Sequence, residues 1–482
     1  MSEPKKVDRR KFIYAGVGAA IIVLAGSTLY LATKPAETVT SVSTSTVPTT
    51  VTSTSTTTSF TSSTTTKTST PWSPVKLTWV FPGTSEPERA WAQNLTNHIN
   101  TVHPGNVTVE TQFIPWANIR DKITVMLLAG NPPDTAWMQF QIREFAKLGS
   151  LLPLDDYVAE WDEFKQFEDF ALETHRVMGK LYAIPTELGT GHMPGARDDL
   201  VKEYWGKGFD AVKSWDDWIE SARAVNGKKP GLYGFALYFG NLEWAGQHVI
   251  DTLCLAEDMD EPDLIKPEFK ERWISTFKLF KSMYELSVPG AENMTLQDCF
   301  RAYAQGSAAY IPRTGAWLYG NIEPLNPTLP PDALTFRVFP PGPHANGKSY
   351  WRGESRGDCI FKACKYPDQA FEMIKAMHTK EFCARFNGIM EVPCRKDITV
   401  DDVLKYSIYS PPEKFRNWAQ KTIDLLKLPR KKSYVMPSDA TSKRIIGTIL
   451  IEVCQNKRTP EEAADKAITD LKNLWGTDVP YS

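Results

Sequence analysis

The sequence predicts an α/β protein whose helices cover a parallel sheet. Segments of alternating apolar residues recur along the chain, and segments with the 3.6-residue period of amphipathic helices separate them. From residue 75 onward these segments follow in the order strand, helix, strand, helix, strand, which is the arrangement of βαβ units. The length of 482 residues suits two or three domains.

The first five elements are each indicated by local patterns. Leu77, Trp79 and Phe81 alternate on one face of a first strand, and Gly130 with two prolines after it ends the second helix. The predicted elements are strands at 75–81, 107–114 and from 135, and helices at 86–102 and 117–130.

The remainder of the chain continues the alternation of helices and strands, with no repeat of 20 to 50 residues. Ser214 and Thr459 are expected to cap helices because each precedes an amphipathic segment with acidic residues in its first turn. Helices are predicted at 214–225, 271–286, 295–306, 367–379 and 459–475, and strands at 231–240, 307–312 and 334–343.

Polar and aromatic residues follow the ends of the first three strands. The carboxyl ends of parallel strands meet at one edge of a sheet, where ligands of open α/β folds bind. We therefore expect a cleft there, although these residues also fit ordinary connections without a site. The candidates are Thr84, Ser85, Glu86, Trp116, Gln139 and Gln141.

The composition excludes some partners and suggests another. With 55 basic and 57 acidic residues, the net charge of −2 gives no basic excess for nucleic acid, so none is expected as a partner. The 15 tryptophans are many for this length, and indole rings suit flat apolar ligands such as sugar rings.

The amino terminus predicts a membrane anchor with the globular part outside the cell. Residues 1–11 are basic, and residues 12–32 form an uncharged apolar stretch long enough to span a bilayer. Arg9 and Arg10 resemble a twin-arginine export signal, but no clear cleavage site follows, which favours a retained single-pass anchor over a cleaved signal. Residues 35–74 are rich in Ser and Thr and predict a disordered, O-glycosylated stalk.

Glycosylation sequons and cysteines agree with an exported protein without identifying it. Asn94, Asn106 and Asn293 begin sequons. The seven cysteines leave at least one unpaired; spacing permits local bridges of Cys383 with Cys394, or Cys359 with Cys364, but does not fix connectivity. No metal-ligand spacing occurs, and no cofactor is expected.

No catalytic motif appears either. The sequence has no GxSxG elbow, P-loop or dinucleotide-binding glycine pattern. The carboxylate pairs Glu86 with Glu88 and Asp155 with Asp156 fit helix starts better than a glycosidase pair. The chain is therefore predicted not to be an enzyme.

Several segments, in their shared order, resemble the family 1 extracellular solute-binding proteins of ABC importers, the group that includes maltose-binding protein. The resemblance spans nearly all of residues 75–475, and each motif alone is weak. The segment "TGHMPGARDDL" departs from the family pattern after the crossover proline. The matching segments are "LLAGNPPDTAWMQF", "AKLGSLLPLDDYV", "VMGKLYAIPTE", "SWDDWIESARAV" and "FRAYAQGSAAYIPRTGAWLYGNI".

The resemblance implies a class II periplasmic-binding-protein fold with two lobes that close on a ligand. It places lobe 1 at residues 75–186 with a return segment near 353–393, and lobe 2 at 187–352 with 394–482. The anchor and stalk look like those of archaeal binding proteins, which tether the receptor near its permease.

The implied function is a monomeric receptor that captures a sugar or oligosaccharide and delivers it to ABC permease subunits. Trp317 matches a family position that often stacks on ligand, but it also fits a buried core residue. Further candidates lie at the crossover or in turns: Glu187, Trp244, Trp351 and Glu354. A surface-tethered glycoside hydrolase and a non-catalytic adhesion protein remain the alternatives.

Overall fold

The computed structural model describes residues 74–83, 86–102, 107–139, 141–386, 389–407 and 411–480. The predicted anchor, nearly all of the Ser/Thr tract, Thr84, Ser85 and Asn106 lie outside these ranges. Within them, every helix is too short or too polar to cross a membrane.

The first sheet begins with the predicted βαβαβ unit. Strand β1 pairs in parallel with both β2 and β3 and lies between them, so the first crossover helix connects neighbouring strands and the second crosses from β2 past β1 to β3. Helix α3 ends two residues before Gly130, whose φ of +69° is the left-handed conformation that ends a helix. The elements are β1 (Val75–Pro82), α2 (Glu86–Val102), β2 (Val107–Ile114), α3 (Ile119–Leu128) and β3 (Thr135–Met138).

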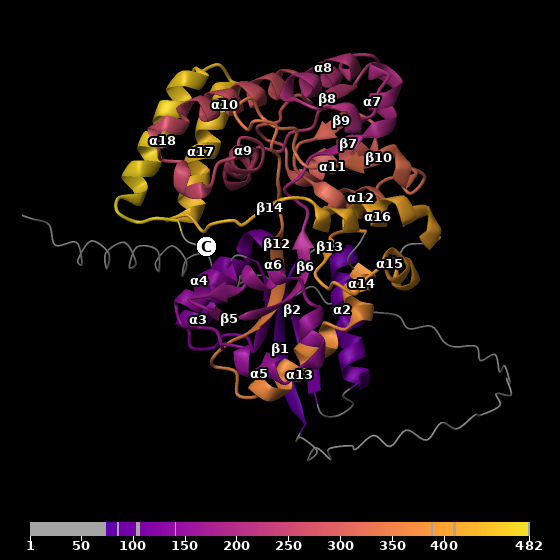
Figure 1. Ribbon diagram of the computed structural model, residues 1–482, viewed down its shortest axis with the longest axis vertical. Coiled ribbons are helices and arrows are strands. Elements are labelled where there is room, and N and C mark those ends of the chain that lie inside the picture. The colour runs from indigo at the N-terminus through magenta and orange to yellow at the C-terminus, as the bar shows by residue number, and fades with distance from the viewer. Residues whose placement is uncertain are drawn as a thin grey trace, which may run out of the picture. The chain divides into compact units, whose positions relative to one another are not determined.

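The first sheet is mixed, whereas the local patterns predicted a parallel one. Strand β12 (Glu354–Ile360) lies between β3 and β6 (Ala183–Gly189) and runs antiparallel to both. Strand β13 (Val392–Pro393) completes the order β13-β6-β12-β3-β1-β2. Pairing between segments more than 160 residues apart has no local signature, so only the folded chain reveals it (Figure 1).

Short helices and one small hairpin surround the first sheet. The helices are α4 (Gln141–Lys147), α5 (Asp155–Ala159), α6 (Asp169–Glu173), α13 (Pro367–Met377), α14 (Lys380–Phe386) and α15 (Val400–Tyr406). The hairpin pairs β4 (Arg176–Val177) with β5 (Lys180–Leu181). The 3₁₀ turns are η1 (Trp116–Asn118) and η2 (Asp162–Gln166).

A second sheet of four strands forms the centre of the other lobe, in the order β10-β7-β9-β8. Its strands are β7 (Gly195–Arg197), β8 (Tyr233–Phe235), β9 (Ala308–Ile311) and β10 (Leu334–Phe336). Its helices are α7 (Asp198–Trp205), α8 (Trp215–Val225), α9 (Leu242–Ala256), α10 (Lys270–Glu285), α11 (Leu296–Ala304) and α12 (Leu318–Ile322), with 3₁₀ turns η3 (Phe209–Ala211), η4 (Glu261–Asp263), η5 (Pro267–Phe269), η6 (Gly315–Trp317) and η7 (Pro331–Ala333).

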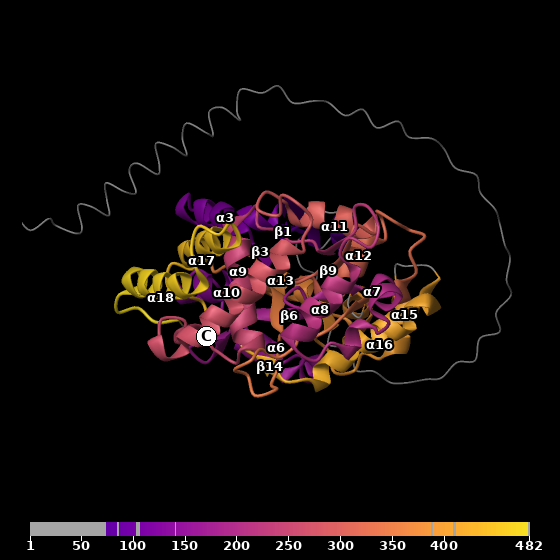
Figure 2. The same ribbon diagram turned by 90° about the horizontal axis from the view of Figure 1, so that it is seen from above.

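The carboxyl-terminal helices pack on this second lobe. Helix α17 (Asp439–Cys454) packs against α9, and α18 (Pro460–Trp475) lies beside α17 and α10, as Figure 2 shows. The elements that precede α17 in the chain are η8 (Pro412–Phe415), α16 (Arg416–Asp424), η9 (Leu425–Lys427) and β14 (Arg430–Lys431). Strand β14 pairs with β11 (Trp351–Arg352). The predicted caps are confirmed: Ser214 and Thr459 each form a capping box.

Two predicted strands are much shorter in the structure. Of residues 231–240 only β8 is a strand, and the amides of Phe239 and Gly240 bond to the loop carbonyls of Ala291 and Met294, each at 3.0 Å. Of residues 334–343 only β10 is a strand, and the prolines at 340, 341 and 343 have no amide to extend the pairing.

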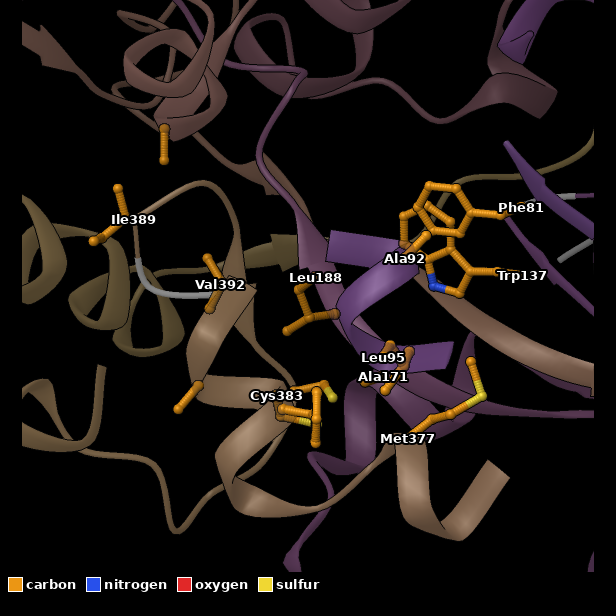
Figure 3. Packing of buried hydrophobic residues seen from close by; sticks show 14 of the residues in the cluster. Phe81, Ala92, Leu95, Trp137, Ala171, Leu188, Met377, Cys383, Ile389 and Val392 are labelled. Carbon is orange, nitrogen blue, oxygen red and sulfur yellow. The ribbon is translucent and has the colours of Figure 1, made fainter. Parts of the chain in front are cut away.

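The cysteines are all free thiols, so neither local bridge that spacing allowed is formed. Most are buried among apolar side chains, and the Cys394 thiol donates to the Pro185 carbonyl at 2.8 Å. Figure 3 shows the core of the first lobe, where the ring of Phe81 stacks on the indole of Trp137 with centroids 4.7 Å apart.

Candidate functional site

A cavity of about 500 Å³ is lined by residues from both lobes. The first lobe contributes residues at the carboxyl ends of β2 and β3, and the second contributes residues of α9, α17 and the turn after β9. The carboxyl ends of β1, β2 and β3 meet here because the three strands are parallel, and this is the edge of the sheet at which a cleft was expected.

Six of the predicted residues line this cavity: Trp116, Gln139, Gln141, Trp244, Trp317 and Glu354. Trp116 begins the turn after β2, and Gln139 follows the last residue of β3. Their contact with a ligand remains a prediction, but their side chains converge from segments that are far apart in the sequence.

The remaining predicted residues are placed elsewhere or lie outside the description. Glu187 is fully buried in β6 and forms an ion pair with Arg356, and Trp351 is fully buried in the core. Neither is part of the cavity wall. Glu86 begins α2, but its side chain lies outside the described part of the chain, as Thr84 and Ser85 do entirely.

Aromatic side chains form opposite walls of the cavity. On the first lobe, Trp137 packs edge-on against Trp116 with centroids 5.7 Å apart. On the second lobe, Trp317 packs edge-on against Phe300, and Trp244 against Tyr238. Partly buried indoles at a cavity surface offer apolar faces on which sugar rings stack.

The position of Trp317 depends on a close approach at Gly315. The φ of Gly315 is +58°, and a Cβ there would lie 2.0 Å from the carbonyl oxygen of Thr190. The amides of Thr314 and Gly315 both donate to the carbonyl of Met193, at 2.7 and 2.8 Å. The turn that carries Trp317 is therefore fixed to residues 190–194, which connect the two sheets.

A polar network that sequence reasoning missed crosses the cavity floor. Gln139 donates to Glu354 at 2.7 Å, and Arg313 donates to Asp251 at 2.7 Å. Between these pairs lies His192, whose Nε2 is 3.3 Å from Glu354 and whose Nδ1 is 2.7 Å from Asp251. The only local signal for this network was the departure from the family pattern at "TGHMPGARDDL", which contains His192.

The network keeps its carboxylates ionised. Burial by itself raises the pKa of both Glu354 and Asp251. His192 and Arg352 outweigh burial at Glu354 and lower its pKa, and His192 and Arg313 do the same at Asp251. Burial also raises the pKa of Tyr238 to about 12, so its hydroxyl stays protonated and donates to the Arg313 carbonyl at 2.8 Å. Carboxylates held ionised accept hydrogen bonds from hydroxyl groups and are poor general acids.

A second buried ion pair lies beside this network. Arg352 of β11 donates to Glu261 at 2.5 Å, and both side chains are 2% exposed. Both residues line the cavity. The position of Arg352 follows from the pairing of β11 with β14, which fixes residues 351–352 against residues 430–431.

One continuous stretch of the cavity wall, residues 433–440, was also not predicted. Arg143 of α4 donates to the carbonyl and hydroxyl oxygens of Ser433 at 2.5 and 3.1 Å. Within this stretch Ser438, whose φ is +47°, directly precedes the first residue of α17. It carries no pattern that distinguishes a cavity wall from an ordinary loop.

The carboxylate of Asp155 has structural partners. Asp155 accepts from the Leu181 amide at 3.0 Å and pairs with Arg176. Among the described residues, no group of three or more His, Cys, Asp or Glu side chains is arranged to hold a metal ion.

Two α/β lobes whose aromatic and hydrogen-bonding side chains enclose a cavity define a ligand-binding receptor. The chain belongs to the family of bacterial extracellular solute-binding proteins, whose sequence model matches residues 94–406. This match confirms the predicted family, and solved structures of similar fold confirm the two-lobed fold. The members are binding proteins and not enzymes.

A curated relative and three solved structures illustrate this similarity. The maltotriose-binding protein of Pyrococcus abyssi is 28% identical over 247 residues, which are 50% of this chain and 49% of that protein. The chain thus matches about half of the relative's length.

The solved structures are similar in fold over most of this chain. The GacH receptor of Streptomyces glaucescens, solved unliganded and with acarbose, has a TM-score of 0.68 at 16% identity and covers 84% of this chain and 100% of its own. MalE of Xanthomonas citri has a TM-score of 0.64 at 17% identity and covers 83% of this chain and 97% of its own. A Thermotoga lettingae protein bound to α-D-tagatose also has 0.64 at 17%, covering 83% and 99%.

Proposed function

We propose that this chain is the substrate-binding receptor of an ABC importer and captures a sugar or oligosaccharide between its lobes. The observation that carries this proposal is the pairing of aromatic walls with an ionised polar floor: Trp116 faces the cavity from one lobe, Trp317 from the other, and Glu354 lies on its floor. Indole faces suit the apolar faces of sugar rings, and carboxylate and amide groups suit their hydroxyls. Similarity to a protein named for maltotriose supports the same class.

The glycoside hydrolase alternative fits the cavity less well. A glycosidase needs one protonated carboxyl group near the scissile bond. The pKa of Glu354 is lowered, because its ion pairs outweigh its burial, and Glu261 is paired with Arg352. The carboxylate of Glu354 is therefore poorly suited to donate a proton.

The test is ligand binding by the full-length chain. Calorimetric titration with maltotriose, mannotriose, maltose and tagatose should give saturable binding of at least one sugar, and chromatography of the same mixtures should show the sugar intact. Hydrolysed sugar would favour the enzyme alternative, and an absence of binding to every sugar would contradict the proposal.

We also propose the cellular arrangement. Residues 12–32 anchor a monomeric receptor in the membrane, residues 35–74 form a stalk, and the globular part lies outside the cell beside its permease. We propose lobe 1 as residues 75–186 with 353–393, and lobe 2 as 187–352 with 394–482. Protease treatment of intact cells should release the globular part, and complete protection would contradict this topology.

A further inference from the structure

We propose that Arg356, Glu391 and Thr190 form a crossing relay that holds the aromatic wall of the first lobe and couples it to the turn carrying Trp317 in the second lobe. Arg356 and Glu391 are positioning residues in this relay. The inference goes beyond the proposed function, and rests on it only where sugar binding is the readout.

The relay begins at the aromatic wall of the first lobe. The guanidinium carbon of Arg356 lies 5.4 Å from the ring centroid of Trp116 and 5.9 Å from that of Trp137. A cation at this distance from an indole face is attracted by the ring. Phe81 stacks on Trp137, so the two neighbours fix the orientation of this indole.

Two buried glutamates hold Arg356 in that place. Its Nη1 forms ion pairs with Glu187 and, at 2.7 Å, with Glu391. Glu187 is fully buried and Glu391 is 1% exposed. Burial lowers the pKa of Arg356, but these two carboxylates outweigh burial and raise it. A guanidinium with two ionic partners has little freedom to leave the indole rings.

The backbone around Arg356 is shaped for the same contact. The pairing of β12 with β6 is irregular between Arg356 and Gly357, which leaves Thr186 as the extra residue on β6. The Thr186 hydroxyl accepts from Trp137 Nε1 at 3.0 Å. A Cβ at Gly189 would lie 3.2 Å from Arg356 Nη2, so glycine leaves room for the guanidinium.

Glu391 continues the relay to the segment that connects the two sheets. Its Oε2 accepts from both the amide and the hydroxyl of Thr190, at 2.5 and 2.7 Å. The Thr190 hydroxyl in turn accepts from the amide of Ala316 at 3.1 Å. Glu391, Thr190 and Ala316 are all buried. Ala316 directly precedes Trp317, which is partly buried.

The relay therefore joins one ligand wall to the other through four consecutive contacts. A displacement of Trp116 or Trp137 on ligand binding shifts the position of the Arg356 guanidinium. Glu391 and Thr190 transmit that shift to the Ala316 amide. Coupling of this kind requires a physical chain of contacts with restricted alternatives, which buried ionic hydrogen bonds supply.

The first test measures amide hydrogen exchange in the full-length chain without ligand. We expect Arg356→Lys and Glu391→Gln to speed exchange of the Ala316 amide roughly 2- to 30-fold, because lysine lacks the planar fork and glutamine lacks the charge. Thr190→Val removes the acceptor itself and should also speed exchange, and Thr190→Ser should restore it.

Arg395→Lys is the matched control. Arg395 is 2% exposed, against 15% for Arg356, and it likewise pairs with two carboxylates, Glu163 and Asp397. Its guanidinium carbon lies 5.6 Å from the ring centroid of Phe167, but Arg395 does not line the cavity. It should leave Ala316 exchange unchanged. Equal exchange in wild type, Arg356→Lys and Glu391→Gln would overturn the relay.

The second test is a double-mutant cycle on maltotriose affinity that combines Arg356→Lys with Trp317→Phe. We expect the double variant to differ from the product of the single effects by more than about twofold, whereas Arg395→Lys with Trp317→Phe should multiply within about twofold. A multiplicative result for the first pair overturns the coupling. Failure of wild type to bind any sugar contradicts the proposed function instead, and the exchange test still decides the relay.

Discussion

The guanidinium of Arg143 donates two hydrogen bonds to Ser433, at 2.5 Å to its carbonyl oxygen and 3.1 Å to its hydroxyl. Arg143 is 5% exposed and belongs to the first lobe, whereas Ser433 begins the cavity wall that leads into α17 of the second. A buried contact thus fixes a segment without regular structure at the edge of the cavity.

Arg143→Met should release this segment. The substitution keeps an apolar stem but removes every donor, and we expect a loss of about 1 to 3 kcal/mol of stability. Urea denaturation measures this loss, and limited proteolysis should cut within residues 433–438. Arg120→Met is the control, because Arg120 also lines the cavity and also pairs with another side chain, that of Glu144. The Arg120 side chain is 43% exposed, and ion pairs this exposed contribute below about 1 kcal/mol to stability. Equal effects of both variants would contradict this role of Arg143.

Trp317→Ala should weaken sugar binding more than it weakens the fold. Trp317 is partly buried and lines the cavity, so loss of a stacked ring should reduce affinity by roughly 1 to 3 kcal/mol. Titration with the sugar found for wild type measures affinity, and the melting temperature without ligand measures stability. Trp205→Ala is the control, since Trp205 is partly buried but lies outside the cavity wall. A large melting loss with intact affinity would identify Trp317 as a core residue.

Asp358→Asn should remove a pH dependence of stability. Asp358 is 1% exposed and accepts from Trp79 Nε1 at 2.7 Å, and burial raises its pKa to about 7. The folded state then binds this proton more tightly than the unfolded state does. The protonated carboxyl group of Asp358 therefore stabilises the folded state below pH 4, and this stabilisation is lost as the pH rises to about 7.

The difference between variant and wild type isolates this effect from other titrating groups. Between pH 4 and pH 8 the free energy of unfolding of the variant, relative to that of wild type, should rise by up to about 4 kcal/mol, since each pKa unit corresponds to about 1.4 kcal/mol. Urea denaturation of both proteins across this range measures it. Parallel pH profiles would show that Asp358 titrates near its ordinary pKa.

Ligand should bring the two lobes closer together. A sugar that contacts both aromatic walls binds the closed arrangement more tightly and therefore shifts the population toward it. Small-angle scattering of the full-length chain should show a smaller radius of gyration at saturating sugar. An unchanged profile, with binding verified by titration in the same sample, would exclude closure of the lobes.

The sequence was sufficient for the local elements of the first lobe. The helix predicted at residues 86–102 and the strand at 107–114 have those bounds in the structure, because their apolar periods and glycine or proline ends are local signals. The same reasoning identified Trp116 and Gln139 as cavity residues, since the carboxyl ends of parallel strands must share an edge. The motifs in their order also indicated the family.

Long-range pairing was decided only by tertiary structure. Glu187 and Trp351 are polar and aromatic like Gln139 and Trp116, which line the cavity, yet Glu187 lies against Arg356 and Trp351 lies in the core. His192, Asp251 and Arg313 form a network from segments that are 59 and 62 residues apart. No periodicity or spacing encodes such a meeting, because it depends on how β6, β7 and α9 are oriented after the chain crosses between sheets. The sequence determined which elements form and to which family they belong, and the tertiary packing decided which of their side chains reach the cavity.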